Sequence, residues 1–188
     1  MQITVRGLIT MVHGMLFGGF FLMAGFGMLV LLHRSMGASG AELSPAARRR
    51  EKAYLITMVA LGWAAVLTGA YVVYPWYRAV PPAGVTDLAA YPQRLLLADP
   101  QTSGWHSLGM EWKEHVAWMA PMLMTMVAWV FLRYEGASEE HRRIRSKIVS
   151  FAVTAFLAAA VAGFFGAMLN KHAPVRGGST ITLMRGTR

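Results

Sequence analysis

Four stretches of this sequence are long, apolar and almost free of charged residues, and they limit the folds available to the chain. About 20 consecutive apolar residues cross the hydrocarbon core of a bilayer as a helix, and a helix satisfies its backbone polar groups without water. We therefore expect an all-α integral membrane protein, a four-helix up-down bundle that forms one membrane domain over residues 1–188. The predicted spans are residues 7–32, 53–74, 115–132 and 148–169.

The composition agrees with a chain that lies mostly in lipid. Hydrophobic residues make up 55% of it and charged residues 14%, whereas soluble domains carry about 25% charge. The chain has no cysteine, which excludes disulfides, thiolate-bound iron–sulfur clusters and covalently attached haem. The first apolar stretch begins after Arg6 and is longer than the apolar core of a signal peptide, so we expect it to remain as a span.

Lysine and arginine are unevenly distributed between the loops, and this predicts an orientation. Residues 33–52 hold five of them, residues 133–147 hold five, and the longer segment 75–114 holds three. Short basic loops stay in the cytoplasm, so we expect both termini, the 75–114 loop and a 170–188 tail on the outer, periplasmic side of a bacterial inner membrane. The net charge of +9 then reflects contact with lipid headgroups, and no nucleic-acid partner is expected.

The outer segment between the second and third spans is expected to be a broken loop. Aromatic residues flank it on both sides, which is typical of the headgroup level of a membrane, and prolines interrupt it. Leu88–Ala98 could form a short helix on the membrane surface, although Pro92 is expected to interrupt that helix. Residues 173–188 are expected to be an irregular tail.

Two histidines are candidates for function because ionisable residues inside a membrane are costly. His13 lies about two turns inside the first span, and His115 lies at the outer start of the third. Diagonal helices of a bundle would place them across its core, where two neutral imidazoles can bind one b-type haem iron from both sides. We therefore predict His13 and His115 as iron ligands, with His172 or a methionine as a substitute second ligand.

Several of these residues also have simpler interpretations. His13 can be a histidine hydrogen-bonded to a neighbouring helix, and His115 can be a residue of the headgroup level. Gly14 and Gly18 would let a flat macrocycle approach the first helix, and they fit close helix packing equally well. A second haem would lie near the inner side, between His33 and His141. The alternative is that these two histidines belong to a solvated face.

The segment 105–115 concentrates titratable groups next to tryptophans at the outer interface. Such groups can exchange protons with a quinol headgroup, and they also suit docking of a partner subunit or anchoring of the third helix. No nucleotide-binding, metalloprotease or nucleophile motif accompanies them, so no catalytic residue is predicted. The candidate quinone or proton site comprises His106, Glu111, Trp112, Lys113 and Glu114.

With four spans and histidines on alternate helices, the chain resembles the small four-helix membrane b-type cytochromes and the haem-bearing anchor subunits of respiratory complexes. The resemblance implies an electron-transfer subunit that passes electrons between quinol and a partner redox protein, with other subunits of a membrane redox complex and lipid as its partners. Diheme cytochromes carry paired histidines on one helix, which this chain lacks, so one haem is expected. The alternatives are a haem-free structural or quinone-binding subunit of a respiratory or photosynthetic complex, and a small transporter.

Overall fold

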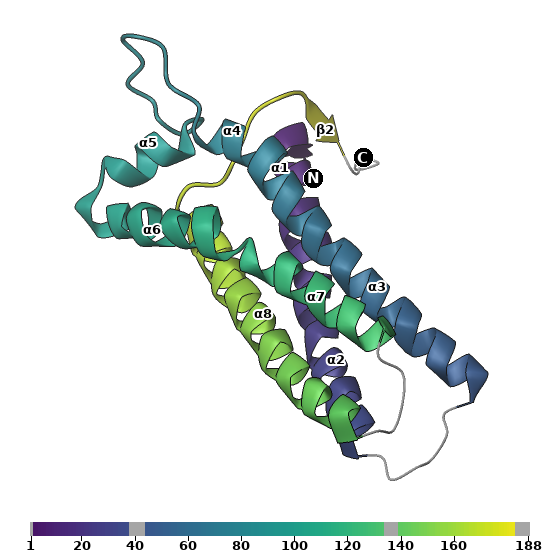
Figure 1. Ribbon diagram of the computed structural model, residues 1–188. Coiled ribbons are helices and arrows are strands. Elements are labelled where there is room, and N and C mark those ends of the chain that lie inside the picture. The colour runs from purple at the N-terminus through teal and green to yellow at the C-terminus, as the bar shows by residue number, and fades with distance from the viewer. Residues whose placement is uncertain (1, 38–43, 134–138, 183–188) are drawn as a thin grey trace.

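The computed structural model describes residues 2–37, 44–133 and 139–182, and most of these residues are helical (Figure 1). Four helical stretches among them are long and apolar enough to cross a membrane: Val5–Leu32, Pro45–Tyr77, Pro100–Arg133 and Lys147–His172. The prediction of four apolar helices of spanning length is therefore confirmed. The second and third stretches begin well before the starts that the hydropathy of the sequence predicted, at Pro45 and Pro100.

The first two spans are each built from α-helix with a π-helical segment inserted. The Thr4 side chain accepts a hydrogen bond from the Gly7 amide and so caps the first helix, and Ser44 caps the second span in the same way through Ala47. The first span comprises α1 (Val5–Met11), η1 (Val12–Gly19) and α2 (Phe20–Gly37), and the second comprises α3 (Pro45–Thr68), η2 (Gly69–Val73) and α4 (Tyr74–Tyr77).

The third span begins at Pro100, well before the predicted start at residue 115. Proline suits the first turn of a helix because that turn needs no amide donor, and the Asp99 side chain caps it by accepting from the Gln101 amide. Hydropathy did not predict this extension because its residues are largely polar or small. The third span comprises α6 (Pro100–Glu111), η3 (Trp112–Val116) and α7 (Met119–Arg133), and the fourth lies within α8 (Glu139–His172).

A break in the third span lies where Pro121 removes a backbone donor. The chain turns at residues 117–118, between η3 and α7. The Ala117 amide reaches back five residues to the Trp112 carbonyl, whereas the Ala120 amide reaches back only three, to the carbonyl of Ala117. The proline is therefore accommodated by a local change of helix type, as expected for a membrane helix.

The segment before the third span contains a helix that starts at the proline expected to interrupt it. Pro92 occupies the first turn of α5 (Pro92–Leu97), where its missing amide costs nothing. The tail after α8 is also more ordered than expected. Residues of β2 (Thr180–Thr182) pair antiparallel with β1 (Gln2–Thr4), with Ile3 opposite Ile181.

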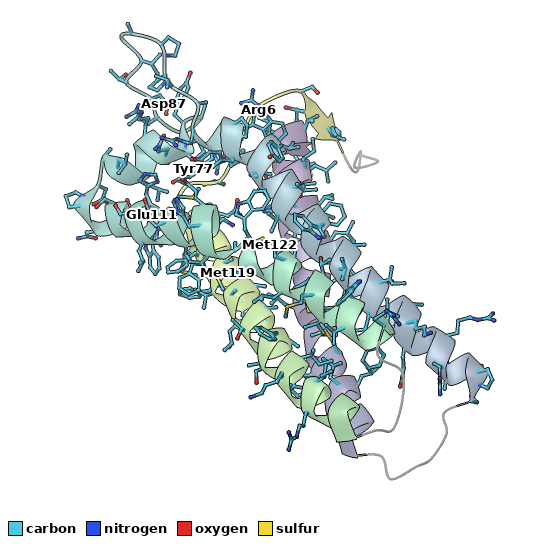
Figure 2. All side chains as sticks on the ribbon, viewed as in Figure 1. Arg6, Tyr77, Asp87, Glu111, Met119 and Met122 are labelled. Carbon is cyan, nitrogen blue, oxygen red and sulfur yellow. The ribbon has the colours of Figure 1, made fainter. Side chains whose placement is uncertain are left out.

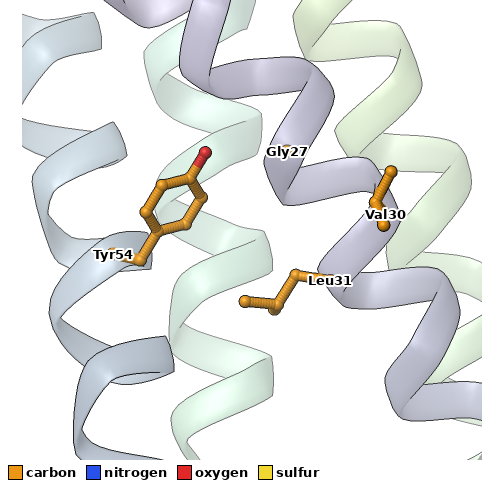
Figure 3. Close-up of a pocket in the computed structure, with 4 residues that line it drawn as sticks. All are labelled: Gly27, Val30, Leu31 and Tyr54. Atoms are coloured by element: carbon orange, nitrogen blue, oxygen red, sulfur yellow. The ribbon is translucent and has the colours of Figure 1, made fainter. Parts of the chain in front are cut away.

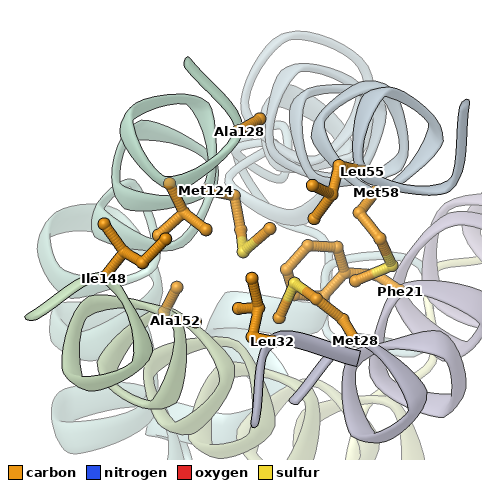
Figure 4. Packing of buried hydrophobic residues seen from close by; sticks show 11 residues of the cluster. Phe21, Met28, Leu32, Leu55, Met58, Met124, Ala128, Ile148 and Ala152 are labelled. Carbon is orange, nitrogen blue, oxygen red and sulfur yellow. The ribbon is translucent and has the colours of Figure 1, made fainter. Parts of the chain in front are cut away.

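The four spans form a ring in which α2 packs on α3 and α8, and α7 also packs on α3 and α8. The first and third spans are thus diagonal across the core. Figure 4 shows side chains from all four helices meeting in this core, among them Phe21, Met28 and Met124, each at most 2% exposed. We call the end with β1, β2, α4 and α5 the capped end, and the end where α3 begins and α7 finishes the basic end (Figure 1).

Candidate functional site

A carboxylate at the capped end is joined to an arginine through a tyrosine. The Tyr74 hydroxyl donates to Glu114 Oε1 at 2.8 Å, and Arg78 Nη1 donates to the Tyr74 hydroxyl oxygen at 2.6 Å. The Arg78 guanidinium also lies 5.5 Å from the centre of the Tyr74 ring, a cation–π distance. Arg78 lies just outside the second span, and its hydrogen bond to Tyr74 raises its pKa, so it remains charged. A chain of hydrogen bonds therefore runs from the loop into the third span.

A second polar group lies next to this chain. Tyr77 is buried, and its hydroxyl is 2.7 Å from His106 Nδ1. The amide nitrogen of buried Gln93 donates to His106 Nε2 at 3.4 Å. Because an amide nitrogen can only donate, neutral His106 carries its proton on Nδ1 and donates it to Tyr77. Figure 2 shows Tyr77 and Glu111 at the capped end of the molecule.

His13 faces the second span at the point where α3 changes into η2. Its Nδ1 lies 3.1 Å from the Thr68 hydroxyl, and that hydroxyl donates to the Ala64 carbonyl at 2.6 Å. Thr68 must therefore accept from His13, which places the imidazole proton on Nδ1 and leaves Nε2 as a base. The ring lies flush against Gly69, where an added Cβ would be 2.7 Å from His13 Cε1. The alternative interpretation of His13, a hydrogen bond to a neighbouring helix, describes this contact.

Lys113 lies on the inward side of η3. The side chain is half-buried, and its ammonium would be 3.1 Å from a Cβ placed on Gly166 of α8. No carboxylate within ion-pair distance of this ammonium is found in the described part of the chain, and it lies close enough to His13 for their charges to interact. The neighbouring Trp112 donates through Nε1 to the Ala158 carbonyl at 3.1 Å and so ties η3 to α8.

Three π-helical segments in the described chain carry or adjoin residues of this cluster. η1 contains His13, η2 begins with Gly69, and η3 contains Lys113 and Glu114. A π-helical turn adds one residue to a helix and rotates the side chains that follow, and such turns are frequent at functional sites. We define the capped-end cluster as the side chains that these segments and their neighbours bring together: His13, Thr68, Tyr74, Tyr77, Arg78, His106, Lys113 and Glu114.

Several of the residues predicted from sequence lie apart from this cluster. His115 is 69% exposed, and its Nδ1 donates to the Glu111 carbonyl at 3.1 Å and lies 3.4 Å from Glu111 Oε2. His172 stacks on the Trp105 ring, with centroids 6.1 Å apart. A Cβ on Gly14 would touch nothing, and one on Gly18 would meet only the His13 carbonyl of its own helix. The side chains of His33 and His141 are outside the described residues.

The predicted haem ligands differ in how well they suit that role. His13 has the features of an axial ligand, because it is half-buried and its Nδ1 is held by a hydrogen bond. His115 has separate neighbours and an exposed side chain, so the two imidazoles do not share a common cavity among the residues described. No group of three or more potential metal ligands is found in that same part of the chain.

No protein-family model matches this chain, and no match was found among curated proteins or solved structures.

Part of the capped-end cluster was not predicted from sequence. Tyr74, Tyr77 and Arg78 belong to a run of aromatic residues that sequence reasoning assigned to the headgroup level alone. The signal that would have found them is an arginine one and four residues after two tyrosines at the end of a span, a spacing that brings the three side chains to neighbouring positions on a helix. Thr68 and Gly69 carry no such signal, because small and hydroxyl residues are common in membrane helices.

Proposed function

We propose that this chain is a subunit of a membrane redox complex that binds a quinone headgroup at the capped end and exchanges its protons there. The observation that carries the proposal is the Arg78–Tyr74–Glu114 chain of hydrogen bonds, which links a carboxylate inside the third span to the loop. Glu114 directly precedes the apolar part of the third span, where a carboxylate is costly and is a candidate for function. A second base, His13 Nε2, and a cation, Lys113, lie in the same cluster.

The groups suit the chemistry of a quinol. Oxidation of a quinol releases two protons and two electrons, and the electrons would pass to a redox centre of the partner protein. The Glu114 carboxylate can accept one proton from the quinol, and the Tyr74 hydroxyl, itself held by Arg78, donates to that carboxylate and fixes its position. The Lys113 ammonium can donate a hydrogen bond to a carbonyl oxygen of the oxidised ring. The Trp112 indole, fixed by its bond to Ala158, supplies an aromatic surface beside them.

The orientation that the basic loops predict places this cluster on the outer side. Arg49, Arg50 and Arg133 all lie at the basic end, which the positive-inside rule assigns to the cytoplasm. A quinol oxidised at the capped end would then release its protons outside, the direction that contributes to a proton gradient. The quinone-binding subunit that the sequence suggested as an alternative would thus have its binding site at the capped-end cluster around η3.

A quinone titration with variants of two glutamates tests the proposal. Addition of decylubiquinone to the purified full-length chain should quench tryptophan fluorescence saturably. Glu114→Gln, which removes the charge and keeps the shape, is expected to weaken binding by a factor of roughly 10 to 150, because a hydrogen bond to a charged group contributes roughly 1.5–3 kcal/mol. Glu111→Gln is the matched control, because Glu111 is 74% exposed on the same span. Equal affinities in wild type and both variants would contradict the assignment of Glu114.

A second candidate function keeps the predicted b-type haem, with His13 as one ligand. It is favoured by the hydrogen bond from His13 Nδ1 to Thr68, which would orient Nε2 toward an iron. A reduced-minus-oxidised absorption spectrum of the intact complex is expected to show a b-type signal that His13→Ala removes. If the wild-type spectrum has no such signal, this candidate is excluded and the quinone site is unaffected.

A further inference from the structure

A crevice opens between α2 and α3 toward the basic end, far along the helices from the capped-end cluster. It has a volume of about 340 Å³ and is lined by Gly27, Val30, Leu31 and Tyr54 (Figure 3). The Tyr54 hydroxyl donates to the Ala24 carbonyl, so its polar atom is satisfied within the protein. The walls that remain are therefore apolar.

Gly27 keeps this crevice open. A Cβ at that position would lie 2.8 Å from the Tyr54 hydroxyl oxygen, so any larger residue would push the ring out of place. The absence of a side chain lets Tyr54 lie across α2 and reach Ala24. The crevice is therefore a consequence of the Gly27–Tyr54 contact, and its shape is fixed by the tyrosine hydrogen bond.

A second cavity follows on the same face of α3. It has a volume of about 600 Å³ and is lined by Pro45, Ala46, Arg49 and Arg50. Residues four apart lie on one face of a helix, so Ala46, Arg50 and Tyr54 form one row along α3. Successive members of this row are about 6 Å apart along the helix axis. The basic cavity at the start of α3 and the apolar crevice are therefore separate, and Arg50 of the first lies one helical turn before Tyr54 of the second.

The two arginines of the basic cavity are exposed to solvent. No ion pair of Arg49 or Arg50 is found among the residues that the structure describes. Paired guanidinium groups bind phosphate through parallel N–H donors. An amphipathic ligand with a phosphate next to an alkyl chain matches the order of the two cavities.

We propose that this face of α2 and α3 binds an anionic phospholipid, with its phosphate at Arg49 and Arg50 and one acyl chain in the crevice lined by Leu31 and Tyr54. The proposal does not depend on the quinone site. Charge complementarity selects an anionic lipid over a zwitterionic one, and the apolar crevice one helical turn from Arg50 selects a lipid over free phosphate. Clusters of arginine and lysine directly beside a span are typical of such binding on the cytoplasmic side.

Native mass spectrometry of the detergent-purified chain tests this site. Phosphatidylglycerol should bind in preference to phosphatidylcholine, and the double variant Arg49→Ala/Arg50→Ala should weaken phosphatidylglycerol binding about thirtyfold, because each basic residue at a membrane surface contributes roughly 1 kcal/mol. The matched control is Arg94→Ala/Arg176→Ala, which removes the same charge from exposed arginines away from the cavity. If both double variants lose phosphatidylglycerol binding equally, the preference for phosphatidylglycerol reflects net charge alone, and the proposed site is overturned.

A third variant tests the acyl-chain half of the proposal. Leu31→Trp fills the crevice without changing any charge, and it should lower phosphatidylglycerol occupancy while thermal stability stays close to that of wild type. Undiminished lipid binding in Leu31→Trp would overturn the placement of the chain. Displacement of the lipid by millimolar inorganic phosphate would show an anion site alone and would also overturn the proposal.

Discussion

Replacing Phe21 by alanine is expected to lower the free energy of unfolding by about 2–3 kcal/mol. Phe21 is 2% exposed and fits between α3 and α7, where a Cβ added to Gly62 would lie 3.1 Å from its ring and 3.5 Å from Pro121. In lipid the transfer of apolar surface from water contributes little. The loss is therefore mainly that of the cavity, about 24 cal/mol for each Å³ left empty.

Phe26→Ala is the control for this substitution. Phe26 lies on the same helix but is 68% exposed, so its removal leaves no internal cavity, and a change below about 0.5 kcal/mol is expected. Unfolding of both variants in mixed micelles of dodecylmaltoside and sodium dodecyl sulfate measures the difference. Similar losses in the two variants would show that the ring of four helices does not enclose the core described above.

Lys113→Met is expected to stabilise the fold while it weakens quinone binding. The Lys113 ammonium is desolvated beside α8 and has no carboxylate partner within the described residues. Replacing such a charge by an apolar side chain of similar length is expected to raise the free energy of unfolding by about 1–3 kcal/mol. A residue that lowers stability in this way is a candidate for a role in function, because stability and activity are often in conflict.

The quinone titration supplies the second half of this prediction. Lys113→Met should lower the affinity for decylubiquinone about tenfold, because the variant cannot donate to a ring oxygen. Lys171→Met is the control, since Lys171 is exposed near the end of α8, and both measured quantities should stay near those of wild type. If Lys113→Met destabilises the protein and leaves quinone affinity unchanged, Lys113 has a structural role.

The spans could be predicted from sequence because lipid requires long apolar helices, and four such stretches are plain in the chain. Their extensions were missed for a physical reason. Pro45 and Pro100 begin the second and third spans in positions where proline is favourable, and hydropathy does not register that effect. The pairing of β1 with β2 joins residues at opposite ends of the sequence, and no local pattern indicates such a contact.

The candidate site was predictable only in part. His13, Lys113, Glu114 and His106 stood out as titratable groups in or beside apolar helices, and the structure places them at the capped end. Which way each side chain points depends on the π-helical segments, and a shift of one residue rotates a side chain by about 100° around the helix. For that reason the sequence could not separate Glu114, bonded to Tyr74, from the exposed Glu111 and His115.

Photolabelling with an azidoquinone reports where the quinone headgroup binds on the chain. The purified chain is irradiated with the probe in lipid nanodiscs, digested and analysed by mass spectrometry, with excess decylubiquinone as competitor. If the quinone binds at the capped end, the competable labelling lies within residues 63–78 and 105–118, which contain Tyr74, Lys113 and Glu114. Competable labelling confined to the basic end, or no labelling that decylubiquinone suppresses, would contradict this placement.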